Sequence, residues 1–178
     1  YFMGAVFEDM CRYYTLKQGI TWEYGCFLTS VGSWWGTENI TDENGNIRAQ
    51  SADIDVVAIS EIDKKAVIGE CKFKNEKIDK RIYETLTRRE KLIAAKYKVS
   101  KYIFFSLSGY TDWFNSLSDE DVLLLTLDSL YRWIMDTERG IAVYNIVLYN
   151  LSCYITYLVL SGKPTRESNP YWLPIFKI

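Results

Sequence analysis

Two carboxylates and a lysine that could share one site lie on two neighbouring apolar segments. Asp55 belongs to segment 52–60, and Glu70 and Lys72 belong to segment 65–73. Both segments predict β-strands, and the short polar stretch 61–64 predicts a hairpin between them. Side chains alternate along a strand, so any even loop length brings the three side chains to one face. Pairing Ser60 with Lys65 sets Asp55 opposite Glu70, whereas a register shifted by two residues sets Asp55 opposite Lys72.

The chemistry that suits this trio is metal-assisted hydrolysis of a phosphodiester. Two carboxylates across an antiparallel pair repel each other unless a cation lies between them. Mg²⁺ or Mn²⁺ suits such a site, because Mg²⁺ commonly binds one or two carboxylates together with water and phosphate. Lys72 would hold an attacking water and stabilise the charge that builds up on phosphorus. The alternative is a solvated strand face. The apolar run before Glu70 favours a central strand, where unpaired charge is costly.

Composition removes several other mechanisms. The chain has 178 residues and no histidine, which excludes Ser-His-Asp and Cys-His triads, His-metal hydrolases and His-based acid–base nucleases. The remaining chemistry must use carboxylates, lysine, tyrosine or thiols. The four cysteines show no CxxC spacing, which favours free thiols in a cytoplasmic protein.

Positive charge is concentrated in one part of the chain. The net charge is −2, yet between residues 72 and 101 eleven basic residues stand against four acidic ones, a local net of +7. A stripe of this kind attracts a phosphate backbone. The alternative is an ordinary solvated helix face with pairs four residues apart, such as Glu84 with Arg88. The candidate nucleic-acid contacts in this stretch are Lys74, Lys77, Lys80, Arg81 and Arg88.

Helical spacing of apolar residues predicts helices over 4–16, 78–97 and 118–133. Besides the hairpin, β-formers predict strands over 21–31 and 101–107. The segment 32–36 predicts a turn, and Asn44-Gly45 predicts another. Segment 141–160 is uncharged and long enough to span a bilayer. Its asparagines and tyrosines weaken that interpretation, so a buried strand pair, a buried helix or a non-native tail is the favoured expectation, and membrane attachment is not expected.

The order of these motifs resembles a known family. The chain is similar to the domain at the C-terminus of many archaeal and bacterial AAA-type ATPases, itself similar to the restriction-endonuclease-like, PD-(D/E)xK fold. The resemblance covers roughly residues 1–135. It is carried by Gly4-x-x-Phe7-Glu8, the turn 32–36, Asp53-Ile-Asp55-Val-Val-Ala58, Ile68-Gly-Glu70-Cys-Lys72 and the run 105–110.

The resemblance implies a fold and a role for individual residues. Residues 1–138 would form an α/β domain in which helices flank a mixed central sheet, and residues 139–178 would form an apolar tail of unassigned place. Asp55 and Glu70 would be the metal ligands, and Lys72 the catalytic lysine. Glu8 would be a supporting acid that reaches the same site, and Asp53 would support the ligands. Trp34 and Trp35 would be structural or line the site, with the aromatic core favoured.

The resemblance also implies a function. The chain would be a Mg²⁺-dependent nuclease module that hydrolyses phosphodiester bonds in DNA. Because no P-loop motif GxxxxGK[ST] occurs in the chain, the ATPase module is expected upstream of Tyr1. The alternative is a non-catalytic appendage of such an ATPase, one that binds nucleic acid or a partner without cutting.

Overall fold

A mixed β-sheet forms the centre of the protein. The computed structural model describes residues 2–42 and 44–136, and within them five strands lie in the order β1-β2-β3-β4-β5. β1, β2 and β3 pair antiparallel, whereas β3, β4 and β5 pair parallel. The strands are β1 (Ser30–Thr41), β2 (Ile47–Ser60), β3 (Lys65–Lys72), β4 (Lys98–Ser106) and β5 (Val122–Thr126). The expected α/β class with helices flanking a mixed sheet is confirmed.

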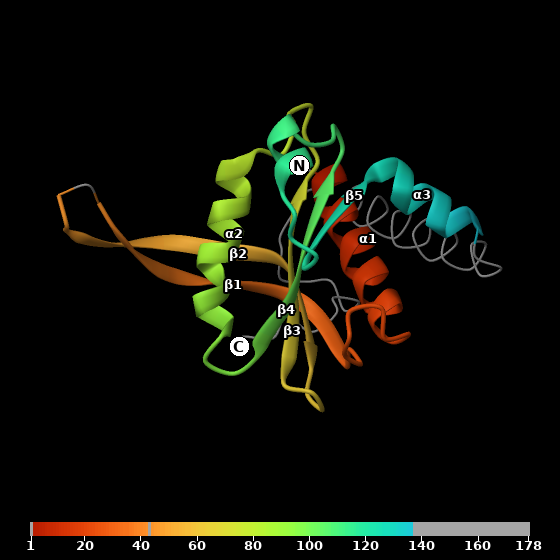
Figure 1. Cartoon of the computed structure of the whole chain (residues 1–178), viewed down its shortest axis with the longest axis horizontal. Helices are drawn as coiled ribbons and strands as arrows, with labels where there is room; N and C mark the ends of the chain where they lie inside the picture. The colour runs from red at the N-terminus through yellow and green to blue at the C-terminus, as the bar shows by residue number, and fades with distance from the viewer. Residues whose placement is uncertain (1, 43, 137–178) are drawn as a thin grey trace, which may run out of the picture.

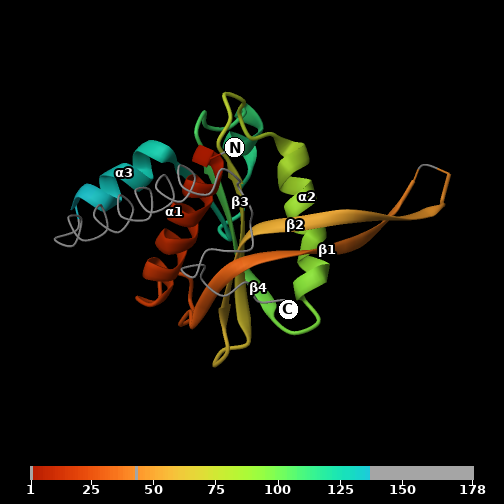
Figure 2. The ribbon, with the colours of Figure 1, turned by 180° about the vertical axis from the view of Figure 1, so that it is seen from behind.

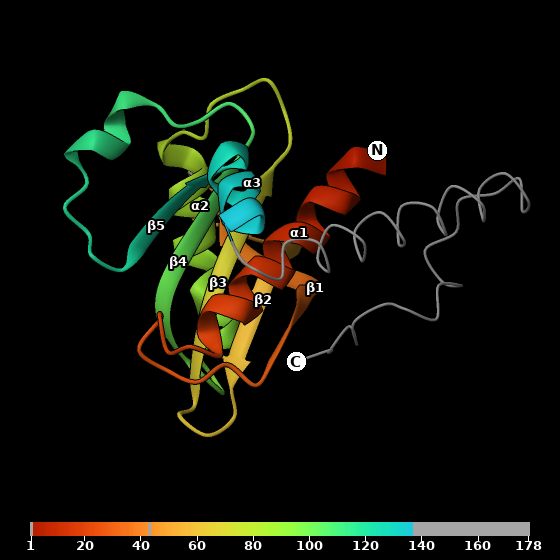
Figure 3. The same cartoon turned by 90° about the vertical axis from the view of Figure 1, so that its right-hand side faces the viewer.

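Helices cover both faces of this sheet (Figure 1). α1 (Phe2–Gly19) and α3 (Leu127–Asp136) lie on one face, where Phe7, Cys11 and Leu130 join a buried apolar cluster with residues of the sheet. α2 (Lys80–Ile93) lies on the other face and contributes Leu86 and Ile93 to a second cluster. Figure 3 shows α1 lying across β2 and β3. A short 3-10 helix, η1 (Asp112–Ser116), lies between β4 and β5.

The helix α2 forms the crossover between the parallel strands β3 and β4. It begins after Asp79, whose carboxylate accepts hydrogen bonds from the backbone N–H groups of Arg81 and Ile82 at 3.0 and 3.2 Å. These bonds satisfy two of the N–H groups that a helix start leaves without partners. The helix expected over 78–97 is therefore confirmed, with both ends shortened.

The hairpin of β1 and β2 extends well beyond α2 and leaves the body of the protein, as opposite views agree (Figures 1 and 2). Its turn carries the expected Asn44-Gly45 pair. Gly45 has φ +82°, a conformation that glycine adopts without steric cost. Asp42 accepts from the backbone N–H groups of Asn44 and Asn46, both at 2.9 Å, which closes the turn.

Three local expectations are wrong. The segment 32–36 is not a turn but part of β1, and most of 21–31 is turn and coil rather than strand. Trp22 and Gly25 in that segment have φ of 67° and 68°, which interrupts any extended run. The segment 118–133, expected to be one helix, contains the strand β5, because the apolar run Val122–Thr126 pairs with β4. The helix α3 starts only after this strand.

The two adjacent tryptophans of β1 differ in burial. Trp34 is buried in the α2-side cluster, whereas Trp35 is 58% exposed. Successive side chains in a strand point to opposite faces, so the core expectation holds for Trp34 alone. The expected tail 139–178 lies outside the described residues. Among the helices that the structure describes, none combines the length and the apolar character needed to cross a membrane.

Candidate active site

The β2–β3 hairpin has the first of the two expected registers. Ser60 pairs with Lys65, and the ladder runs to Val56 opposite Gly69. The ladder ends there, and Asp55 and Glu70 are the residues next to this last pair. The sheet is tight at this point: a Cβ added to Gly69 would meet the backbone oxygen of Ile103 at 2.9 Å. Glycine is therefore required where β2, β3 and β4 come together beside the candidate site.

The β1–β2 ladder contains a β-bulge at Asp55. On one side of the irregularity Gly32 pairs with Val57, and on the other side Trp34 pairs with Ile54. Two residues of β2 therefore lie opposite one residue of β1, which disrupts the ladder locally and bends the strand. Bulges of this kind re-aim a side chain and are frequent beside active sites.

The bulge also changes which side chains share a face. Ile54 and Val57 both join the α2-side cluster, although they are an odd number of positions apart, namely three, whereas Val56 joins the α1-side cluster. Strict alternation through 52–60 is therefore wrong at this point. A hydrogen bond connects Asp55 to β3 instead. Its Oδ2 accepts from the backbone N–H of Cys71, at 2.8 Å, and Cys71 lies between Glu70 and Lys72 in the chain.

Glu70 and Lys72 form an ion pair beside Asp55, with 2.5 Å between Lys72 Nζ and Glu70 Oε1. The Glu70 side chain is only 12% exposed. Burial and the nearby charge of Asp55 raise the pKa of Glu70 to about 7, although Lys72 acts to lower it. Burial likewise raises the pKa of Asp55, against the bond from Cys71 and the charge of Lys72. The two carboxylates therefore hold protons more tightly than exposed acids do.

The pKa of Lys72 is also raised, but for a different reason. Burial alone would lower the pKa of the Lys72 ammonium, but the carboxylates of Glu70 and Asp55 outweigh burial and raise it. Lys72 is therefore positively charged at neutral pH. It can donate hydrogen bonds and stabilise negative charge, but it does not act as a general base there.

Glu8 is connected to this site through an arginine that the sequence analysis missed. Arg12 Nη1 lies 3.6 Å from Glu8 Oε2 and donates a 2.8 Å hydrogen bond to the backbone oxygen of Asp55. Arg12 Nη2 also donates to Asp9 at 2.8 Å. The spacings of three and four residues from the acids to Arg12 on one helix were the available signal. Asp53 lies outside the buried group, with its side chain 73% exposed.

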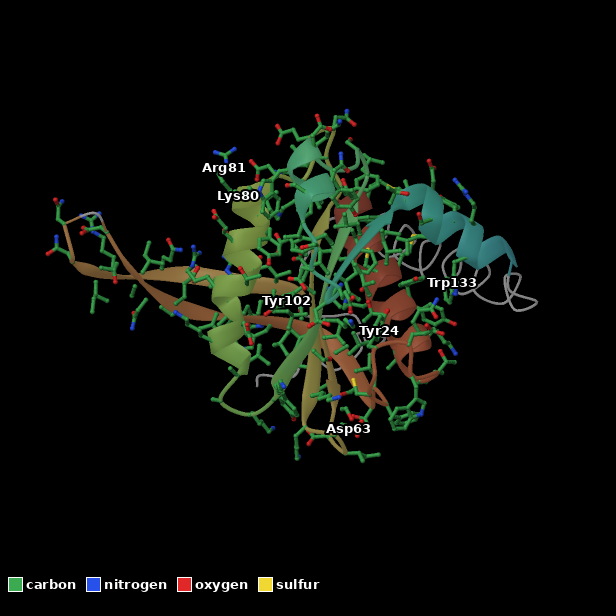
Figure 4. The ribbon with its side chains drawn as sticks, in the orientation of Figure 1. Tyr24, Asp63, Lys80, Arg81, Tyr102 and Trp133 are labelled. Carbon is green, nitrogen blue, oxygen red and sulfur yellow. The ribbon has the colours of Figure 1, made fainter. Side chains whose placement is uncertain are left out.

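The candidate nucleic-acid contacts divide into two sets. Lys74 and Lys77 are exposed on the loop that follows Lys72. The three on α2 each have an acidic partner: Lys80 with Glu84 at 3.3 Å, Arg81 with Asp79 at 2.9 Å, and Arg88 with Glu38 at 3.1 Å. Lys80 and Arg81 lie together at the start of α2 (Figure 4).

A second polar cluster, also missed from sequence, holds β1 against α2. Glu38 is 5% exposed and accepts hydrogen bonds from Gln50 at 2.9 Å and from Arg88 at 3.1 and 3.2 Å. Arg89 reaches the same carboxylate at 3.4 Å and also bonds to the backbone oxygen of Asp53. Burial would raise the pKa of Glu38, but the bonds from Arg88 and Gln50 outweigh it and lower that pKa.

Two carboxylates, Asp55 and Glu70, lie at the end of the β2–β3 ladder. Lys72 engages one oxygen of Glu70, and Cys71 engages one oxygen of Asp55, and each carboxylate has a second oxygen. Two like charges in a buried site are costly unless a cation compensates them. Across residues 2–42 and 44–136 no group of three or more His, Cys, Asp or Glu side chains is arranged to hold a metal ion. Mg²⁺ needs fewer protein ligands, because it keeps several waters.

A family model described as archaea bacterial proteins of unknown function matches residues 1–86. That span includes α1, the hairpin strands β1 to β3 and the candidate residues Glu8, Asp55, Glu70 and Lys72. No curated protein and no solved structure matches the chain.

Proposed function

We propose that the chain is a Mg²⁺- or Mn²⁺-dependent nuclease module that hydrolyses phosphodiester bonds in DNA on a restriction-endonuclease-like fold. The proposal depends on one observation. Asp55, Glu70 and Lys72 lie at the end of the β2–β3 ladder, where burial raises the pKa of both carboxyls and the charge of Asp55 raises that of Glu70 further. Such perturbed acids with a charged partner mark candidate functional sites.

Asp55 and Glu70 would hold the cation through their second carboxylate oxygens. A bound Mg²⁺ would polarise the scissile phosphate and compensate the two negative charges. The Lys72 ammonium would donate to a phosphate oxygen or to the attacking water, and so stabilise the charge that grows on phosphorus. The water oxygen bonds to phosphorus as the bond from phosphorus to the leaving oxygen breaks; the water gives its proton to solvent, and the leaving oxygen takes one up from solvent. No histidine is needed for these steps.

The charge next to the site supports a polyanionic substrate. Lys74 and Lys77 are exposed on the loop that begins directly after Lys72, so a phosphate backbone held there lies close to the carboxylates. Lys80 and Arg81 extend this positive charge to the start of α2, although each is partly neutralised by its acidic neighbour. Exposed lysines attract phosphate without reading sequence.

DNA cleavage in the presence of metal tests the proposal. Plasmid and single-stranded DNA are incubated with the wild-type chain and Mg²⁺ or Mn²⁺, and chelation by EDTA should stop cleavage. Asp55→Asn should abolish cleavage, and Lys72→Ala should slow it by about 10²- to 10³-fold, the usual loss of one charge-stabilising donor. Lys91→Ala, which removes an exposed lysine from α2, is the matched control and should cut normally.

Two results would contradict the nuclease function. Equal cleavage by all variants would point to a contaminating enzyme. DNA binding that survives Asp55→Asn and Lys72→Ala, without cleavage under either metal, would favour the non-catalytic appendage instead.

An AAA-type ATPase as partner is part of the same proposal and is supported by the sequence resemblance. The coding sequence upstream of residue 1 tests it, because a P-loop GxxxxGK[ST] is expected there.

A further inference from the structure

Arg12 is an unusual residue for the inner side of an amphipathic helix. It belongs to α1, and its side chain is only 8% exposed. Arginine is rarely buried unless its charge is paired. Here Asp9 and Glu8, from the same helix, lie 2.8 and 3.6 Å from the guanidinium. These two acids compensate the charge and fix the side chain in a position from which Nη1 also reaches the sheet.

The group that receives this donor is the main chain of Asp55. Arg12 Nη1 lies 2.8 Å from the Asp55 carbonyl oxygen. Asp55 lies in the β-bulge, between the pairs Gly32 with Val57 and Trp34 with Ile54, where the regular ladder is interrupted. A buried carbonyl at such a point needs a partner, because an unpaired backbone group away from water costs as much as a lost hydrogen bond. Arg12 supplies that partner from a different element.

Asp55 therefore has its backbone carbonyl and its carboxylate both fixed. The Asp55 carbonyl is held by α1 through Arg12, and its carboxylate is held by β3 through the Cys71 N–H at 2.8 Å. With the main chain anchored on one side and the carboxylate on the other, the second carboxylate oxygen has little freedom. Ligands held this way bind a cation without losing rotamer entropy at that moment.

We propose that Arg12 is a positioning residue, which locks the bulge of β2 and so aims the Asp55 carboxylate at the cation and the scissile phosphate. Its catalytic consequence rests on the nuclease function proposed above. The positioning role of Arg12 also accounts for the link between α1 and the site: Glu8 and Asp9 orient Arg12, and Arg12 orients Asp55. Arg12 itself touches neither substrate nor cation.

Two substitutions and one control test this role. Arg12→Gln removes the charge and shortens the reach, and Arg12→Lys keeps the charge with a single donor. Arg48→Gln is the matched control, because Arg48 is 73% exposed on the projecting hairpin, where it pairs with Asp42 at 3.5 Å. Circular dichroism first selects variants that keep the fold; Arg12→Lys carries the test if Arg12→Gln unfolds.

The first readout needs no metal and no activity. In the metal-free protein, the carbonyl ¹³C resonance of Asp55 should shift in Arg12→Gln, and the Asp55 and Val56 amides should exchange faster with deuterium. Both should be unchanged in Arg48→Gln. The second readout is Mn²⁺ binding, whose affinity should fall about 10- to 100-fold in Arg12→Gln, as for other groups that orient a metal ligand. Arg12→Lys should recover part of this loss.

Cleavage kinetics complete the test. Arg12→Gln should lower kcat and leave KM for DNA unchanged, since Arg12 does not contact the substrate. An Asp55 carbonyl resonance and a Mn²⁺ affinity equal to those of the wild type would overturn the inference. If the wild-type chain neither binds Mn²⁺ nor cuts DNA, the nuclease function fails, and the resonance and exchange data still show whether Arg12 holds the bulge.

Discussion

Replacing Glu70 by glutamine should stabilise the metal-free protein at alkaline pH while removing metal binding. Glu70 is a buried acid whose pKa is raised to about 7 by burial and by Asp55. Above that pH the wild-type protein must carry a second negative charge in the site. Glutamine has nearly the same shape but no charge, and its amide oxygen can still accept from Lys72. The variant therefore resembles the wild type with Glu70 protonated.

The size of the effect follows from the pKa of Glu70. Its ordinary value is 4.5 and its folded value is about 7, and each unit corresponds to about 1.36 kcal/mol. Because the pKa of Glu70 is higher in the folded protein, the folded protein binds this proton more tightly than the unfolded chain does between these two pH values. The contribution of Glu70 to stability is complete below pH 4.5 and is lost as pH rises to 7. The loss amounts to about 3 kcal/mol at most.

Urea unfolding of both proteins in EDTA, from about pH 5 to pH 8, measures this difference. Titrating groups far from the site act equally in both proteins, so the difference in unfolding free energy reports Glu70 together with its neighbours Asp55 and Lys72. The unfolding free energies of the wild type and the variant should be nearly equal at low pH, and Glu70→Gln should be the more stable protein at pH 8. Mg²⁺ at about 1,000 times its Kd should reverse the order at high pH, because binding at that excess stabilises the wild type by about 4 kcal/mol and the variant not at all.

A variant that is equally stable or less stable at pH 8 without metal would refute the reasoning. It would mean that the ionised Glu70 is fully compensated by Lys72, so that the site has no unmet need for a cation. Stabilisation of Glu70→Gln by Mg²⁺ as large as that of the wild type would also contradict it, because the ion would then bind elsewhere.

Two further predictions concern charges outside the site. Glu38→Ala should destabilise the protein by about 3 to 5 kcal/mol in urea unfolding, because it leaves two arginines of α2 without their buried partner, whereas the exposed pair lost in Glu84→Ala should matter little. Replacing Lys74 and Lys77 by alanine should weaken DNA binding at every sequence and reduce the salt slope, measured by fluorescence anisotropy, by about 2. Lys98→Ala, at the start of β4, should leave that slope nearly unchanged.

The local sequence determined the hairpin that carries the candidate site. A polar stretch of even length between two apolar runs of strand-forming residues allows few registers, and the observed one, with Ser60 opposite Lys65, was among the two expected. α2 could be predicted in the same way, from apolar spacing and charged residues on one side. These features depend on residues close in the chain, so a single sequence contains the information for them.

Only the tertiary structure decided the remainder. The run Val122–Thr126 becomes a strand because it finds β4 beside it, and its own composition does not distinguish strand from the start of a helix. The hydrogen bond from Arg12 that holds the Asp55 carbonyl at the bulge joins residues 43 positions apart. A hydrogen bond of this range forms when packing of α1 on the sheet brings its two groups together, and no pattern in the local sequence of either segment encodes that distance.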